Sequence, residues 1–120
     1  LWSRGFWGPG GASGLSVAVD ASGELALAGA LGLGRVDFGG GSLTSAGLLD
    51  TFVAKYLTMD GSHVWSRSFG GPNYEVAWAA AIDGGGTVVA TGHFRDSVDF
   101  PCEPITCAGA EDAFLLLLPP

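Results

Sequence analysis

The chain has 120 residues, 21 of them Gly, and a formal net charge of −7 from 12 acidic and 5 basic side chains. That length allows one ordinary domain. An apolar fraction of 48% excludes a disordered chain, and the negative charge excludes a nucleic-acid binder because phosphate would be repelled. The longest large-apolar run, Phe114–Leu118, is far shorter than the roughly 20 residues of a membrane span, so we expect no membrane insertion. The excess of Gly, without a collagen period, predicts many turns.

The first predicted hairpin joins Ser16–Val19 to Glu24–Ala28 through the turn Asp20–Gly23. Asp at the first turn position can accept hydrogen bonds from the following backbone, and Gly at the fourth can adopt a positive φ. The same pattern returns later in the chain, with strands at Ala79–Ile82 and Thr87–Thr91 around a similar turn.

A second type of hairpin is predicted between Thr51–Leu57 and His63–Phe69, with its turn at Met59–Gly61. The Asp-Gly pair in this turn is a strong short-range hairpin signal. Glycine-rich connectors occupy Gly32–Leu49 and Arg95–Glu111. Each connector contains Val-Asp-Phe and then Leu-Thr or Ile-Thr, which predicts a small extra hairpin in each.

These elements belong to an internal repeat, which the sequence shows as identical residues 63 positions apart, or 62 after a one-residue deletion. The repeated pairs include Trp2 and Trp65, Phe6 and Phe69, Asp20 and Asp83, Gly23 and Gly86, Val36 and Val98, Phe38 and Phe100, Asp50 and Asp112, and Phe52 and Phe114. Each repeat then holds four main strands with apolar residues on both faces, as in a sheet between two neighbours. Four-stranded sheets stacked radially are the blades of a β-propeller.

At this level the sequence resembles the bacterial β-propeller repeat family called SBBP. The segments that carry the resemblance are Val17–Gly23, Val36–Gly39, Leu43–Gly47, Asp50–Lys55 and Gly61–Trp65. It covers nearly the whole chain, and the second copy departs most at Pro101–Pro104 and Leu115–Leu118. The resemblance implies a secreted propeller with no assigned catalysis, in an extracellular, periplasmic or cell-surface location.

We therefore expect an all-β fold of two consecutive four-stranded antiparallel blades in an incomplete propeller. The predicted division is a last strand of a preceding blade and linker at 1–13, a first blade at 14–70, and a second blade lacking its final strand at 71–120. Because two blades would leave apolar sheet faces open, we expect further propeller blades as partners, in the same chain or in other copies.

Cys102 and Cys107 are predicted to form a local structural disulfide around a Pro turn. A loop that small would contribute only about 2 kcal/mol by the chain-entropy estimate, and its formation would indicate an oxidising compartment. Both cysteines are absent together from the first repeat, as expected if they serve each other. Free thiols and half of a metal site are the alternatives, although zinc needs more ligands than His63 and His93 readily supply.

No motif for nucleophilic catalysis, phosphate binding or dinucleotide binding is present, so no catalytic, cofactor-binding or metal residue is predicted. Asp96, Asp99 and Glu103 could supply oxygen ligands to calcium, but the EF-hand spacing is missing. Asp50 and Asp112 each precede a Phe strand, which indicates a repeated bond to the backbone.

The four tryptophans favour packing over a carbohydrate-stacking platform. Trp2 and Trp65 are repeated, which indicates contact between blades. Trp7 and Trp78 are not equivalent, so one of them is a candidate for exposure.

The sequence thus predicts a non-enzymatic propeller segment that serves as a scaffold or interaction surface, with a protein or carbohydrate as candidate ligand. The first alternative is a fragment of a propeller enzyme of the lyase or quinone-cofactor dehydrogenase type, which a His/Arg/Glu cluster at the inner-strand ends would favour. The second is a calcium-dependent adhesion module.

Overall fold

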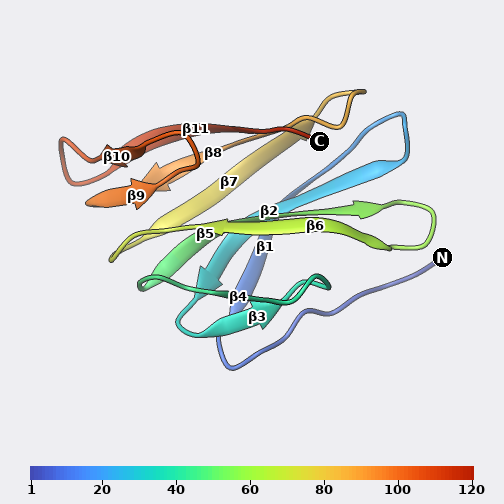
Figure 1. Ribbon diagram of the computed structural model, residues 1–120, viewed down its shortest axis with the longest axis horizontal. Coiled ribbons are helices and arrows are strands. Elements are labelled where there is room, and N and C mark those ends of the chain that lie inside the picture. Colours follow the sequence, from blue (N-terminus) through green and yellow to red (C-terminus); the bar gives the residue numbers. More distant parts are fainter.

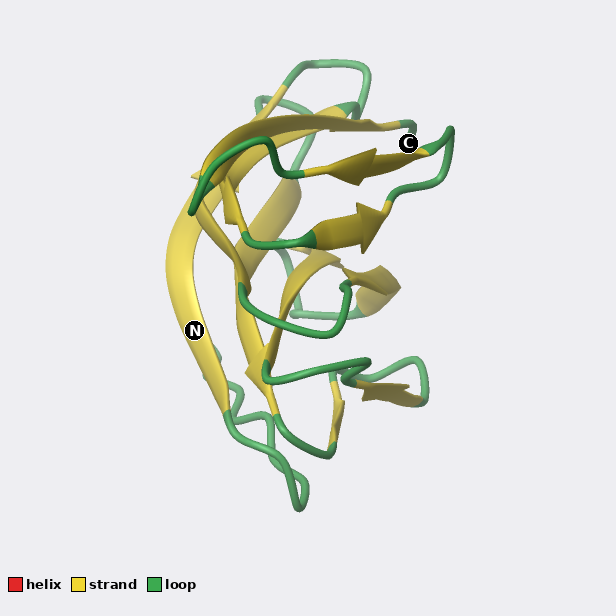
Figure 2. Ribbon diagram, turned by 90° about the vertical axis from the view of Figure 1, so that its left-hand side faces the viewer, coloured by secondary structure: helices red, strands yellow, loops and turns green.

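The computed structural model describes all 120 residues and contains eleven β-strands (Figure 1). Strands and loops make up the whole molecule (Figure 2), and no helix exists that could cross a membrane. All sheet pairings between the strands are antiparallel. The predicted all-β class is therefore confirmed.

The larger sheet has four strands in the order β1-β2-β5-β6. Its strands are β1 (Ala12–Val19), β2 (Glu24–Gly32), β5 (Leu49–Leu57) and β6 (His63–Phe69). The central strand β5 is buried over seven of its nine residues, from Asp50 to Tyr56. Such continuous burial requires cover on both faces of the sheet, which agrees with the apolar residues at successive positions in its sequence.

A second sheet has three strands in the order β11-β8-β7. Its strands are β7 (Glu75–Ile82), β8 (Val88–Phe94) and β11 (Asp112–Leu118). Two further hairpins are formed by short strands: β3 (Arg35–Asp37) with β4 (Ser42–Thr44), and β9 (Ser97–Asp99) with β10 (Pro104–Thr106). The hairpins predicted from the turn signals and within both connectors are thus confirmed.

The hairpin turns form through the side chains that predicted them. Asp20 accepts hydrogen bonds from the backbone N–H of Ser22 and Glu24 at 2.9 and 2.8 Å. Asp83 accepts from Gly85 and Thr87, both at 2.9 Å. Each of these two turns ends in a Gly with φ near +90°, a conformation that costs other residues steric strain.

The two main sheets pack against each other through small residues of the first sheet. Ala26, Ala28 and Val53 are fully buried there. They share one core with residues of the second sheet and its short hairpin: Ala77, Val88, Ala90, Phe94, Val98, Phe114, Leu116 and Leu118. The edge strands also meet directly, because Ser16 Oγ accepts a hydrogen bond from Ala80 N at 3.0 Å. Small side chains at the contact allow this close approach.

A second core lies on the opposite face of the four-stranded sheet. It consists of Leu31, Val36, Phe38, Phe52, Ala54 and Tyr56, and Phe6 of the N-terminal segment packs against it. Phe6 lies 5.3 Å from Phe38 and 5.5 Å from Tyr56 between ring centroids. The N-terminal segment therefore covers part of this face.

No strand is observed at the N-terminus, where the last strand of a preceding blade is predicted, and that division of the chain stays a prediction. Residues 1–11 contain no strand, although Trp2 Nε1 donates to the carbonyl of Thr58 at 2.8 Å. The backbone of this segment makes isolated hydrogen bonds to the neighbouring strands, from Gly10 N to the carbonyl of Arg35 at 3.2 Å and from Gly32 N to the carbonyl of Gly11 at 2.6 Å, whereas a β-strand needs a continuous ladder.

Candidate functional site

A groove opens where the start of β1, the end of β2 and the start of β5 meet β7. Its volume is about 400 Å³, and we call it the Trp78 groove. Apolar side chains that line it are Leu15, Ala30, Leu49, Val76 and Trp78. A neighbouring hollow of about 300 Å³ shares Leu49 and Val76 and adds Tyr74, His93 and Arg95. Both volumes are in the range that small-molecule sites occupy.

Polar and aromatic side chains form a chain of contacts beside this groove. Trp78 Nε1 donates to His93 Nδ1 at 2.8 Å. His93 Nε2 lies 3.2 Å from Glu111 Oε1, and the other oxygen of Glu111 accepts from Arg95 Nη2 at 3.0 Å. The Arg95 guanidinium lies over the ring of Tyr74, 5.4 Å from its centroid.

The hydrogen-bond pattern assigns the tautomer of His93. An indole N–H can only donate, so Nδ1 of His93 accepts and Nε2 carries the proton that faces Glu111. In this state His93 is neutral, and the charges of Arg95 and Glu111 offset each other. The chain of contacts beside the groove therefore presents hydrogen-bonding groups without a net charge.

These contacts hold an exposed aromatic ring in place. Trp78 is 55% exposed, and the ion pair between Arg95 and Glu111 is roughly half exposed on both sides. Exposed ion pairs contribute only about 0–1 kcal/mol to stability. The main consequence of the chain of contacts is thus to fix the orientation of Trp78.

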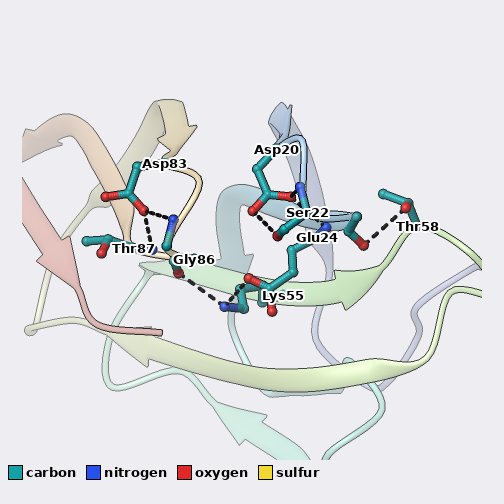
Figure 3. A network of polar contacts seen from close by, with 10 residues as sticks. Asp20, Ser22, Glu24, Lys55, Thr58, Asp83, Gly86 and Thr87 are labelled. Carbon is teal, nitrogen blue, oxygen red and sulfur yellow. Dashed lines mark hydrogen bonds and ion pairs between the residues drawn. The ribbon is translucent and has the colours of Figure 1, made fainter.

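The opposite end of the sheet pair carries a different polar network (Figure 3). Lys55 is 1% exposed, and its Nζ donates to Glu24 Oε2 at 2.7 Å and to the carbonyl of Gly86 at 3.1 Å. Glu24 and Lys55 belong to the first sheet, whereas Gly86 lies in the turn between β7 and β8. Lys55 therefore fastens the first sheet to a turn of the second.

The acidic turn residues near Lys55 serve the backbone. The hydroxyl of Ser22 lowers the pKa of Asp20, and the backbone N–H of Thr87 lowers that of Asp83. Asp60 has a lowered pKa because it accepts hydrogen bonds from Ser62. All three carboxylates act as local turn acceptors, as predicted from their positions before Gly.

The predicted backbone role of Asp50 and Asp112 is confirmed. Asp50 is 2% exposed and accepts from Ala46 N at 2.8 Å, Gly47 N at 3.3 Å and Ser45 Oγ at 2.9 Å. Asp112 is only partly buried and accepts from Ala108 N at 2.7 Å. Each carboxylate closes the connector loop that precedes its strand.

Glu75 is a buried carboxyl that the sequence did not single out. It is fully buried, and its Oε2 accepts from Gly71 N at 2.8 Å, while Oε1 has no hydrogen-bond partner. Burial raises the pKa of Glu75 to about 7, and the carboxylates of Asp50 and Asp96 add to the shift. The counterpart of Glu75 in the first repeat is Ala12, so the repeat carried no signal for it.

The residues of the predicted disulfide and of the candidate calcium site are not joined in the structure. Cys102 and Cys107 carry free thiols in the structure, so the predicted disulfide is not confirmed and stays a prediction. Asp96, Asp99 and Glu103 do not gather into a group that could hold a metal ion.

The contact between blades predicted for Trp2 and Trp65 stays a prediction, whereas the exposure predicted for one of Trp7 and Trp78 is confirmed. Trp65 packs against the core between the two sheets. Trp2 lies on the other face of the first sheet, beside Tyr56. Trp7 is 79% exposed, and Trp78 is also exposed, so neither of the two unrepeated tryptophans is buried.

Comparison with known proteins gives no assignment. No protein-family model matches the chain, and no curated protein matches it. The resemblance to SBBP repeats therefore stays a prediction.

Proposed function

We propose that the chain carries two successive blades of a β-propeller of the SBBP type and serves as a non-catalytic scaffold or interaction surface outside the cytoplasm. The first blade spans 12–70, since β1 begins at Ala12, the second spans 71–120, and the residues before β1 end a preceding blade. The support is that side chains at repeated positions occupy equivalent places on the two sheets.

Aromatic stacking supplies the first equivalence. One stack has centroid distances of 5.3 and 4.2 Å and consists of Phe6, Phe38 and Phe52. The corresponding stack, at 5.8 and 5.2 Å, consists of Phe69, Phe100 and Phe114. In both, a Phe from outside the sheet packs on a Phe of the connector, which packs on a strand Phe. Repeated packing of this kind is expected of repeated structural units.

The repeated tryptophans supply the second equivalence. Trp2 shares a hollow on the first sheet with Val17, Leu25, Leu27 and Tyr56. The counterparts of these four residues lie in or against the core that Trp65 packs on, and they are Ala80, Val88, Ala90 and Leu118. Trp2 thus packs on the first sheet in the way that Trp65 packs on the second. The proposal of a preceding blade that ends at Trp2 predicts this equivalence.

The single observation that carries the proposal is the open face of the second sheet. Ala26, Ala28 and Val53 are buried beneath the second sheet. Their counterparts one repeat later are Val89, Thr91 and Leu115, of which Thr91 is exposed and Leu115 is 78% exposed. Leu117 beside them is 64% exposed. A further blade, from the same chain or from another copy, would cover this face.

The open face makes the proposal testable by sedimentation velocity of the chain at increasing concentration. We expect self-association, because contiguous exposed apolar residues of this kind drive it. Leu115→Glu should abolish it, and Met59→Glu should not, since Met59 is equally exposed at a turn away from the face. A chain that stays monomeric at tens of micromolar would overturn the proposal, as would association unaffected by Leu115→Glu.

One observation favours the enzyme alternative, because His93, Arg95 and Glu111 do come together. Both ring nitrogens of His93 are engaged, by Trp78 and by Glu111, and both oxygens of Glu111 are paired. A histidine acts as general base through a free ring nitrogen within reach of the substrate proton, and His93 offers none in this arrangement. We therefore prefer the non-catalytic role.

A further inference from the structure

The two repeats differ in side-chain chemistry at a set of positions around the Trp78 groove. Five second-repeat residues that form the chain of contacts beside it are Tyr74, Trp78, His93, Arg95 and Glu111. Their first-repeat counterparts are Gly11, Leu15, Ala30, Gly32 and Leu49, which carry no hydrogen-bonding side chain and which all line the groove itself. By contrast, turn positions such as Asp20 and Asp83, and core positions such as Phe52 and Phe114, carry identical residues in the two repeats. A scaffold role alone does not call for such a set of changes at one place.

The changes place aromatic and polar side chains beside the groove: Trp78 lines the groove itself, and Tyr74, His93 and Arg95 line the neighbouring hollow. Trp78 adds a large, half-exposed ring, and the indole N–H is occupied by His93. Glu111 and Arg95, each more than 40% exposed, keep unused acceptor and donor capacity after pairing with each other. Leu15, Leu49 and Val76 supply the apolar remainder.

We propose that the Trp78 groove binds a neutral saccharide, which stacks on the Trp78 ring and donates and accepts hydroxyl hydrogen bonds at Glu111 and Arg95. A sugar ring has an apolar C–H face and a polar rim, so it matches a flat aromatic surface bordered by hydrogen-bonding groups. The charges beside the groove offset each other, which favours a neutral ligand over an ionic one. His93 acts as a positioning residue that orients the ring.

This inference rests on the proposed non-catalytic role, and saccharide binding and self-association are measured separately. His93 pairs with Ala113 and lies on the same face of the second sheet as Leu115, so the polar end of the groove borders the open face that a further blade would cover. Self-association without saccharide binding would refute the groove alone. Saccharide binding by a strictly monomeric chain would refute the blade proposal alone.

The test is isothermal titration of the full chain with four neutral trisaccharides: cellotriose, maltotriose, xylotriose and chitotriose. We expect at least one to bind at millimolar concentration or below. Trp78→Ala should weaken that binding by about tenfold, the size of an aromatic stacking contribution. Trp78→Phe should retain part of the affinity, and His93→Ala should weaken it less than Trp78→Ala.

Trp7→Ala is the matched control, because Trp7 is more exposed than Trp78 and does not line this groove. Its affinity should equal that of the wild type. Circular dichroism checks that each variant is folded, and Trp78→Phe replaces Trp78→Ala should the latter not fold. Absence of binding to all four trisaccharides would overturn the proposal. Equal loss in the Trp7 and Trp78 variants would overturn it too.

Discussion

Replacement of Asp50 by Ala should destabilise the protein far more than the same change at Asp112, its repeat counterpart. Asp50 is almost fully buried and accepts three hydrogen bonds from its loop, whereas Asp112 accepts one and is partly exposed. A hydrogen bond to a charged group contributes about 1.5–3 kcal/mol, and a buried donor left without a partner costs about 1–3 kcal/mol. Allowing for non-additivity, we expect a loss of about 3–5 kcal/mol for Asp50→Ala and about 1–2 kcal/mol for Asp112→Ala.

Urea denaturation followed by tryptophan fluorescence measures both losses, with the slope of the transition checked for each variant. The pair is its own control, because the substitution is the same and both residues follow a connector and precede a Phe strand. Equal losses in the two variants would refute the reasoning that burial and the number of accepted bonds set the cost. A larger loss at Asp112 would refute it as well.

Three further outcomes are expected. Because the pKa of Glu75 is raised from 4.5 to about 7, the native state binds more protons than the unfolded state in that window, and stability falls as the pH rises through it. Relative to the Glu75→Gln variant, the free energy of unfolding of the wild type should fall by up to about 3 kcal/mol between about pH 4 and pH 8. Parallel profiles of stability against pH for the two proteins would contradict this. Lys55→Met should lower stability by about 1–3 kcal/mol, which is less than the loss on breaking a fully buried ion pair, because Glu24 is partly hydrated. An unchanged melting temperature would count against the role of Lys55. In protein recovered from an oxidising compartment, non-reducing mass spectrometry should find Cys102 and Cys107 joined, and alkylation of both thiols would exclude the disulfide.

Local chemistry made the hairpins predictable. Asp20 and Asp83 signal their turns because an Asp carboxylate can bond the backbone two and four residues on, and the Gly that follows can take the required φ. The roles of Asp50 and Asp112 were equally visible, since a repeated Asp before a repeated strand indicates a repeated bond. Such bonds span only a few residues, so sequence spacing suffices to find them.

The Trp78 groove was only partly predictable. Trp78 stood out as an unrepeated tryptophan. A His/Arg/Glu cluster was named as a feature that would favour an enzyme, but the sequence did not indicate which residues would form it. Bringing His93 to Trp78 requires the register of β7 against β8, including the bulge between Ala77 and Ala79. Bringing Glu111 to Arg95 requires the start of β11 to meet the end of β8. A one-residue slip would move each side chain to the other face.

The sequence by itself determined the all-β class, the hairpins, their turns and the loop-closing carboxylates, because these depend on residues close together in the chain. Only the tertiary structure decided how the two sheets pack. It also buried Glu75, which raises the pKa of that carboxyl, and placed Lys55 beside the carbonyl of Gly86. It also decided that residues 1–11 form no strand, since their backbone makes isolated hydrogen bonds to Gly32 and Arg35 and no continuous ladder. The physical reason is that burial and long-range pairing are properties of surfaces brought together in space, and sequence spacing does not encode their register.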